Sequence, residues 1–252
     1  MFLNGGRTMN CRAWLILAAC VLFATALIAA GCINPAKEHL YKGNEFFEQD
    51  LYDEAITEYT EAIELDTQLV MAYNNRGLAY HNKGALDEAI ADFDKAIELS
   101  PENAVMYYNR GGVYFERGQF QKAVADYDKA IVLAPQFTVA YNNRGQAYAM
   151  MSQFNRAIAD YDKAIELNPE LAIAYDNRGL MYRNKGELDK AIADFDKAIE
   201  LDPGLAKAYF NRGYTYNEKG DKDKAKADLE KCIQISTDSG LTKAAEDLLE
   251  RL

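Results

Sequence analysis

The sequence predicts an all-α solenoid of about six helix pairs with a capping helix at its C-terminal end. The main observation is an internal repeat, because the segment from Val139 to Leu171 has near copies on both sides at a spacing of 34 residues. A fixed period of this length is typical of a solenoid, in which each unit packs only on its neighbours. The repeated columns are two tyrosines, a glycine and a closing proline: Tyr73, Tyr107, Tyr141, Tyr175, Tyr209; Tyr80, Tyr114, Tyr148, Tyr182, Tyr216; Gly77, Gly111, Gly145, Gly179, Gly213; Pro101, Pro135, Pro169, Pro203.

Each unit is expected to form two antiparallel helices, as the third unit illustrates. Residues 104–117 favour a first helix that Gly118 ends, and residues 121–133 favour a second helix that Pro135 cannot continue. Gly111 and Ala123 are small, so we expect the two helices to approach closely where they cross. The larger apolar side chains are expected to fill the space between layers. These are Tyr107, Tyr114, Phe120, Tyr127, Ile131 and Leu133.

This pattern of columns resembles the tetratricopeptide repeat (TPR) family. An aromatic residue is followed by Gly four residues later, Tyr after three more, Ala after nine more, then an aromatic residue, a second Ala and a terminal Pro. The resemblance implies a right-handed superhelical solenoid. Its repeats are expected at residues 36–69, 70–103, 104–137, 138–171 and 172–205, followed by a degenerate sixth repeat at 206–239 and a capping helix at 240–252.

The N-terminal segment, residues 1–31, has the three parts of a secretory signal peptide. Arg7 and Arg12 precede any acidic residue, an apolar run covers residues 13–30, and small residues follow up to Cys32. The sequence Ala29-Ala30-Gly31-Cys32 resembles the lipobox of bacterial lipoproteins. The resemblance implies cleavage before Cys32, a lipid on its sulfur, and residues 32–35 as a short linker.

This interpretation predicts a protein that is exported and lipid-anchored to the cell envelope. Ile33 rather than Asp follows Cys32, which implies the outer membrane if the cell is Gram-negative. Two alternatives stay open, since this run of eighteen residues, apolar apart from Thr25, is just long enough for an uncleaved membrane anchor, and another secreted form would share the same leader. Met9 is an alternative start to Met1.

Composition argues against several classes of function. The formal net charge of −11 repels phosphate backbones, so nucleic acid is not an expected partner. The only histidines are His39 and His81, and there is no Gly-rich phosphate loop, so no catalytic site, metal site or cofactor is expected. Recurrent aspartate pairs such as Asp126 and Asp128 are interpreted as solvated surface. Cys232 falls in an alanine column and is expected to be buried.

Two charged columns are predicted to pair with each other. The first consists of arginines and the second of aspartates sixteen residues later, and repeat one replaces both at once with Lys42 and Glu58. We expect each arginine to pair with an aspartate of its own or the adjacent repeat. An anion-binding track is the alternative. The members are Arg76, Arg110, Arg144, Arg178 and Arg212, and Asp92, Asp126, Asp160, Asp194 and Asp228.

The family resemblance implies a binding groove lined by the first helix of each repeat. Aromatic, Met, Asn and Gln side chains in this register suit a protein or peptide partner. Val105 and Ile173 also fall in this register but are equally compatible with a place in the core. The predicted groove residues are Asn74, Leu78, His81, Tyr108, Phe115, Asn142, Gln146, Met150, Asp176, Leu180, Arg183, Phe210 and Tyr214.

The function expected from these features is a non-catalytic scaffold for protein binding. A pilotin-like factor for pilus or secretion assembly, and an adaptor that regulates an envelope hydrolase or protease, are the alternatives. Some TPR proteins grip the acidic tails of heat-shock chaperones with a clamp of Lys, Asn and Arg. Asn44 and Asn75 fit that clamp, but Leu40 stands where its first Lys is required.

Overall fold

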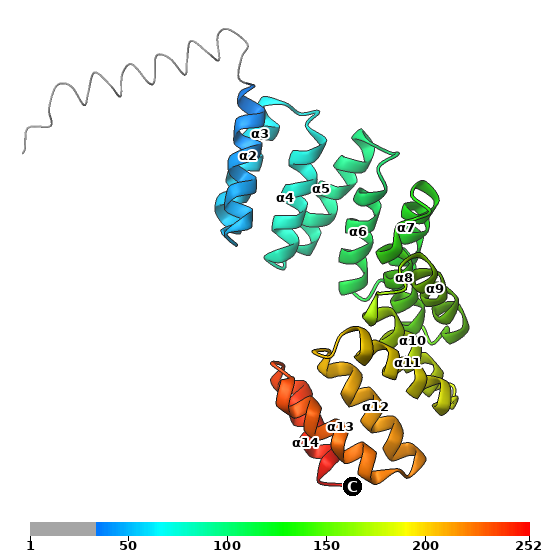
Figure 1. The fold of residues 1–252 in the computed structure, drawn as a ribbon. Helices are drawn as coiled ribbons and strands as arrows, with labels where there is room; N and C mark the ends of the chain where they lie inside the picture. The colour runs from blue at the N-terminus through cyan, green and yellow to red at the C-terminus, as the bar shows by residue number, and fades with distance from the viewer. Residues whose placement is uncertain (1–33) are drawn as a thin grey trace, which may run out of the picture. The chain divides into compact units, whose positions relative to one another are not determined.

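The computed structural model describes residues 34–252, and this part of the chain contains thirteen α-helices and no strand (Figure 1). The predicted all-α repeat fold is therefore confirmed. The predicted signal peptide at residues 1–31 and the predicted lipid site at Cys32 lie outside the described residues. No helix within residues 34–252 has both the length and the apolar character needed to cross a membrane.

The chain divides into two compact units, which are described separately. Unit 1 ends at Pro101 and unit 2 runs from Glu102 to Leu252. Unit 1 contains α2 (Pro35–Glu48), α3 (Tyr52–Leu65), α4 (Val70–Asn82) and α5 (Leu86–Leu99). Unit 2 contains α6 (Ala104–Glu116), α7 (Phe120–Leu133), α8 (Thr138–Met150), α9 (Phe154–Leu167), α10 (Ala172–Asn184), α11 (Leu188–Leu201), α12 (Ala206–Lys219), α13 (Lys222–Ile235) and α14 (Ser239–Leu249).

Even-numbered helices from α2 to α12 are the first helices of the repeats, and the odd-numbered ones are the second helices. Within unit 2 each helix packs on the next, and α6, α8, α10 and α12 also contact one another in sequence. The first helices of unit 2 therefore share one continuous surface.

The turn inside most repeats requires a left-handed backbone. Gly118 has φ of +71°, and the glycines of three other turns have similar values. In repeat four, Ser152 occupies the position of this turn glycine and takes the same conformation, with φ of 58°. The predicted break at Gly118 is confirmed, since α6 ends two residues before it.

Inside each of the first five repeats, a glycine of the first helix lies against an aromatic ring of the second, and Leu229 takes the place of the ring in repeat six. A Cβ atom at Gly145 would lie 2.7 Å from Cε1 of Tyr161, whose side chain is buried. The expected close approach is thus confirmed, and the ring itself fills the space that the glycine leaves. The fully buried residues of this column are Tyr59, Phe93, Tyr127, Tyr161, Phe195 and Leu229.

The expectation that the repeated tyrosines are interlayer core holds only in part for two columns. Tyr107 and Tyr114 are only half-buried, as are most of their equivalents. Tyr107 still packs against a core cluster, and both rings lie beside the guanidinium of Arg110. Cys232 is buried as predicted.

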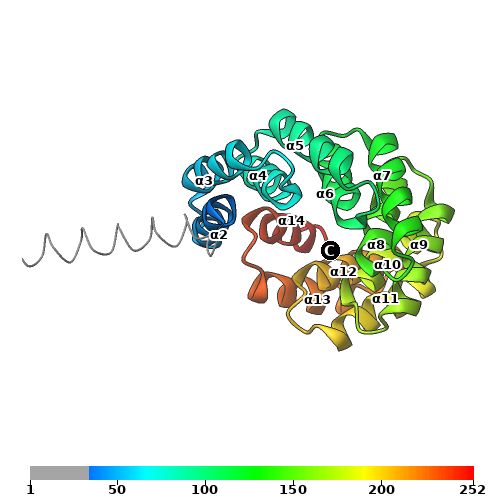
Figure 2. The ribbon, with the colours of Figure 1, turned by 90° about the horizontal axis from the view of Figure 1, so that it is seen from above.

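The last helix closes unit 2. α14 contacts α12 and α13 (Figure 2), with Ala245 buried and Leu241, Leu248 and Leu249 partly buried. Asp238 caps its N-terminus by accepting the backbone N–H of Gly240 at 2.7 Å. The predicted capping helix is confirmed, and it covers the apolar face that the end of a repeat array would otherwise expose.

Candidate protein-binding surface

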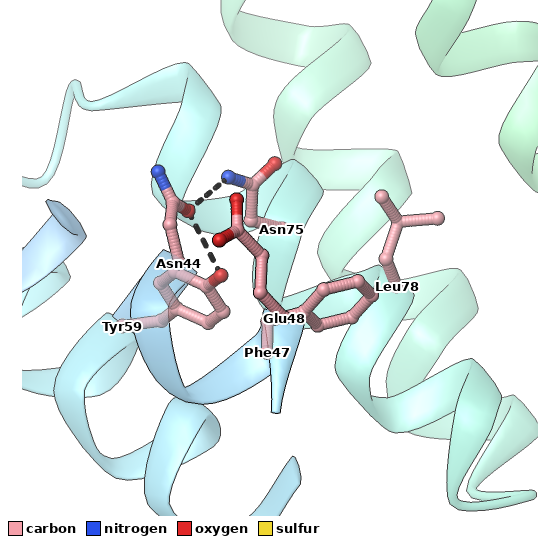
Figure 3. Close-up of a pocket in the computed structure, with 6 residues that line it drawn as sticks. All are labelled: Asn44, Phe47, Glu48, Tyr59, Asn75 and Leu78. Atoms are coloured by element: carbon pink, nitrogen blue, oxygen red, sulfur yellow. Dashed lines mark hydrogen bonds between the residues drawn. The ribbon is translucent and has the colours of Figure 1, made fainter. Parts of the chain in front are cut away.

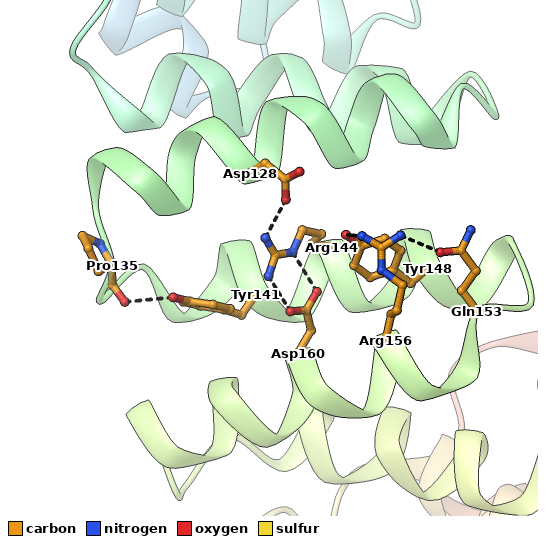
Figure 4. Close-up of polar contacts among 8 residues, drawn as sticks. All are labelled: Asp128, Pro135, Tyr141, Arg144, Tyr148, Gln153, Arg156 and Asp160. Atoms are coloured by element: carbon orange, nitrogen blue, oxygen red, sulfur yellow. Dashed lines mark hydrogen bonds and ion pairs between the residues drawn. The ribbon is translucent and has the colours of Figure 1, made fainter.

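A ladder of ion pairs holds the repeats together. In repeat four, Nε and Nη2 of Arg144 donate to the two carboxylate oxygens of Asp160 at 2.8 and 2.5 Å, and Nη1 donates to Asp128 of the preceding repeat at 2.5 Å (Figure 4). Arg178 and Arg212 make the same three bonds. The predicted pairing is confirmed. The carboxylates accept hydrogen bonds from the guanidinium N–H groups that an anion-binding track would need, which argues against that alternative.

The aspartates of this ladder are structural, which corrects their interpretation as solvated surface. The side chain of Asp160 is only 8% exposed, and Asp128 joins one repeat to the next. Burial opposes the charge of Arg144, but the hydrogen bonds and charges of Asp160 and Asp128 outweigh it and raise the pKa of Arg144. The arginine therefore stays charged wherever the protein is folded.

Two tyrosines flank each of these arginines. Tyr141 and Tyr148 lie three residues before and four residues after Arg144, on the same helix face. Its Cζ lies 5.5 and 5.9 Å from the two ring centroids. Arg156 adds a bond from Nη2 to the Tyr148 hydroxyl at 2.6 Å (Figure 4). One face of α8 is thus occupied by Arg144 and its two flanking tyrosines.

Asparagines tie the first helices to one another, which the sequence analysis missed. The Nδ2 of Asn177 donates to Oδ1 of Asn142 at 3.1 Å, and the Nδ2 of Asn143 donates to the hydroxyl of Tyr108 at 3.0 Å. An Asn-Arg dipeptide recurs in five repeats and was the available signal. Asn142, expected to hold a partner, is 5% exposed and holds the neighbouring helix instead.

Unit 2 has a pocket of about 210 Å³ on its first-helix surface. It brings together four of the predicted groove residues. Met150 is 60% exposed at this pocket, and Ile173 also lines it. The lining residues are Phe115, Gln146, Ala149, Met150, Tyr161, Ile173, Asn177, Leu180, Met181 and Lys207.

Lys207 is the one charged residue that lines this pocket, and it was not predicted. Its column carries Lys37, Met71, Val105, Val139 and Ile173 in the earlier repeats. A lysine in place of the apolar residues of the four preceding repeats was the signal that could have identified it.

Three other predicted residues form a separate cluster in unit 2. The Cζ of Arg183 lies 4.5 Å from the ring centroid of Tyr214, and its Nε lies 3.8 Å from a carboxylate oxygen of Glu218. The ring of Phe210 lies 6.3 Å from that of Tyr214. Tyr108 packs instead against Phe137, with ring centroids 4.9 Å apart. None of these residues lines the pocket of unit 2.

Asp176 was predicted to face the groove, but its side chain is fully buried. Its Oδ1 accepts a hydrogen bond from Asn211 at 2.8 Å, whereas Oδ2 has no hydrogen-bond partner and lies 3.9 Å from Nζ of Lys207. Burial raises the pKa of Asp176, and the bond from Asn211 and the charge of Lys207 only partly oppose this. This carboxylate lies beneath the surface and cannot contact a partner directly.

Unit 1 has its own pocket, also of about 210 Å³, where α2, α3 and α4 meet (Figure 3). Leu78 is the predicted residue that lines it. Asn74 is 4% exposed and donates to Asn75, and His81 lies half-buried one turn beyond Leu78. The lining residues are Asn44, Phe47, Glu48, Tyr59, Asn75 and Leu78.

Comparison with protein families matches the repeats along most of the described chain. Models described as TPR repeat match residues 43–84, 111–152 and 179–220. Models described as tetratricopeptide repeat match residues 70–103 and 138–171, residues 206–239, and residues 93–125 and 160–193. In the curated protein Hsp70-Hsp90 organizing protein 3 of Arabidopsis thaliana, 51 residues are 45% identical, which is 20% of this chain and 9% of that protein. The chain thus matches only a small part of that relative's length.

Several solved structures resemble the chain over most of its length. YrrB, described as a TPR protein with an unusual peptide-binding site, is 31% identical with a TM-score of 0.58, covering 75% of this chain and 97% of YrrB. MamA is 30% identical with a TM-score of 0.61, covering 66% of this chain and 96% of MamA. PilW, described as a type IV pilus biogenesis factor, has a TM-score of 0.74 at 20% identity, covering 83% of this chain and 97% of PilW. At that identity the likeness to PilW is one of fold alone.

Proposed function

Because the chain belongs to the tetratricopeptide repeat family, whose members bind protein or peptide partners, we propose that it is a non-catalytic binding scaffold. The pocket of unit 2 is its main docking point for a peptide segment. The observation that carries this proposal is Met150, a large apolar side chain that is 60% exposed at the edge of a pocket. Exposed apolar surface at a preformed pocket is typical of a binding site.

The chemistry of the pocket suits an extended peptide. Phe115, Ile173 and Leu180 offer apolar surface for one partner side chain, and Gln146 offers an amide for a main-chain group. The ion-pair ladder and the asparagine bonds hold the first helices in register. A preformed surface of this kind lowers the entropic cost of binding.

Replacing Met150 by aspartate is expected to weaken peptide binding about tenfold or more. The bound peptide would then remove a charged carboxylate from water, where in the parent it covers an apolar side chain. Peptides would be selected from a random dodecapeptide library on the full detergent-solubilised chain. Their dissociation constants would then be measured on the parent and the variant. Val132→Asp is the matched control, since Val132 is 73% exposed and lies outside the pocket.

Both substitutions place the same charge on an exposed apolar position, so stability should change little in either. For selected peptides that crosslink to unit 2, equal binding by Met150→Asp and Val132→Asp would contradict the assignment of this pocket. A selected peptide that crosslinks elsewhere on unit 2 would do the same.

We also propose that the scaffold is held at the cell envelope by a lipid on Cys32. The support is the order of basic residues, apolar run and small residues that ends at Cys32. Intact and proteolytic mass spectrometry of the membrane-extracted protein should find an acylated N-terminus at Cys32, and Cys32→Ser should abolish the modification. A retained Met1 or Met9 would instead indicate an uncleaved anchor.

The narrower roles depend on which partner is found. Roles in pilus or secretion assembly and in regulating an envelope hydrolase or protease remain predictions, because the likeness to PilW concerns the fold. A chaperone-tail receptor is disfavoured by Leu40, which is 9% exposed within the core of unit 1 and offers no cation. The absence of catalysis also remains a prediction.

A further inference from the structure

The two pockets are built on the same frame. Every residue that lines the pocket of unit 1 has an equivalent, three repeats later, that lines the pocket of unit 2. Three positions are alike in both pockets, namely Tyr, Asn and Leu. The six pairs are Tyr59 and Tyr161, Asn75 and Asn177, Leu78 and Leu180, Asn44 and Gln146, Phe47 and Ala149, and Glu48 and Met150.

The positions that differ give the pocket of unit 1 another chemistry. Glu48 replaces the exposed Met150, and no lysine takes the place that Lys207 has in unit 2. The carboxylate of Glu48 has no hydrogen bond or ion pair to the described residues, and its side chain is exposed. Phe47 adds an aromatic ring beside it. The pocket thus presents a solvated, unpaired negative charge next to apolar surface.

Polar groups of this pocket are already oriented. Oδ1 of Asn44 accepts the Tyr59 hydroxyl at 2.9 Å and the Nδ2 of Asn75 at 2.8 Å (Figure 3). The amide of Asn44 therefore turns its Nδ2 away from these neighbours, and its two N–H groups have no partner among the described residues. Burial raises the pKa of Tyr59 to about 12, with the charge of Glu48 acting in the same direction, so the tyrosine stays neutral.

The rest of unit 1 adds further negative charge to that of Glu48. Residues 34–101 contain five Lys and Arg against fifteen Asp and Glu, a net charge of −10. Residues 102–252 contain 21 against 24, a net charge of −3. The acidity of the protein is therefore concentrated in unit 1, and it favours a positively charged partner there.

We propose that the pocket of unit 1 is a second docking site, which selects a basic peptide segment. The aliphatic stem of a Lys or Arg lies on Phe47 and Leu78, while its cationic head faces Glu48. The protein would then hold two partner segments of different chemistry on two copies of one frame.

Matched peptides test this assignment. The probes are fluorescein-labelled nonapeptides Gly-Ser-Leu-X-Gly-X-Leu-Ser-Gly, in which X is Lys, Gln or Glu. Anisotropy titrations on the full solubilised chain should show the Lys peptide binding tightest and the Glu peptide weakest, with the difference shrinking at high salt. Two variants remove the charge of Glu48: Glu48→Gln, and Glu48→Met, which introduces the residue found at the equivalent position 150. Both should weaken binding of the Lys peptide about fivefold and leave binding of the Gln peptide unchanged.

Glu45→Gln is the control, because Glu45 is exposed on the same helix but does not line the pocket. Equal weakening by Glu45→Gln and Glu48→Gln would show that only the diffuse charge of unit 1 attracts the peptide, and would overturn the proposal. So would equal binding of the Lys and Gln peptides. This site does not depend on the pocket of unit 2, since peptides selected there should respond to Met150→Asp and not to Glu48→Gln.

Discussion

Replacing Asp160 by alanine is expected to destabilise unit 2 by about 3 kcal/mol, because removing one partner of a buried ion pair leaves the other charge uncompensated. Arg144 would keep only Asp128, which binds one of its three donating nitrogens. The side chain of Arg144 is 18% exposed, so water cannot replace the lost carboxylate fully. The free energy of unfolding would be measured by urea denaturation, followed by far-ultraviolet circular dichroism.

Asp162→Ala is the matched control for this experiment. Asp162 lies two residues further along α9 and pairs only with Nη1 of Arg178. Its replacement by alanine removes the same charge as Asp160→Ala. Its side chain is 52% exposed, so the expected loss is below about 1 kcal/mol. Similar losses in Asp160→Ala and Asp162→Ala would contradict the structural role of the buried ladder. Hydrogen exchange should place the extra loss in the helices next to Arg144, since a repeat array opens locally.

Replacing Asp176 by asparagine is expected to stabilise the protein at neutral pH by about 1 to 3 kcal/mol, because a buried carboxylate oxygen without a hydrogen-bond partner is costly. The equivalent residue of repeat four is Asn142, which accepts from Asn177 and donates to Asn143. An asparagine at 176 would find the same partners in Asn211 and Asn177. Urea denaturation at several pH values measures the change.

The pH dependence gives this prediction a definite sign. The pKa of Asp176 is raised in the folded state, so its stabilising contribution is complete below the ordinary value of about 4. That contribution is lost as the pH rises through the folded pKa. In Asp176→Asn, this decrease in the free energy of unfolding with rising pH should be absent. In Asp162→Asn, which removes an exposed charge, the decrease should remain. A parent and an Asp176→Asn variant with parallel pH profiles would contradict the assignment.

Much of the fold was predictable from the sequence because the repeat places equivalent residues in equivalent surroundings. The helix pairs, the break at Gly118 and the pairing of Arg144 with Asp160 all followed from columns that keep one residue type. The expectation about the tyrosines holds only in part. Tyr107 and Tyr114 have the size of core residues, but they lie half-buried on either side of the guanidinium of Arg110.

The candidate site was predicted only in part. The register assigned Phe115, Gln146, Met150 and Leu180 to one surface, and the structure places all four around one pocket. That they bind a partner stays a prediction. It also assigned Asn142 to the groove, where the structure buries it under a neighbouring helix. A helix register specifies the face on which a residue lies, but not whether the next helix covers that face.

The sequence by itself determined the repeat, the helix boundaries to within a few residues, the ladder of ion pairs and the acidic character of unit 1. Each of these depends on spacing or composition, which can be read along one chain. Only the tertiary structure decided that Asn44 and Glu48 share a pocket with Asn75, and that this pocket has a counterpart around Met150. Such a pocket is formed by side chains of several helices, and its chemistry depends on which of them remain uncovered after the helices pack.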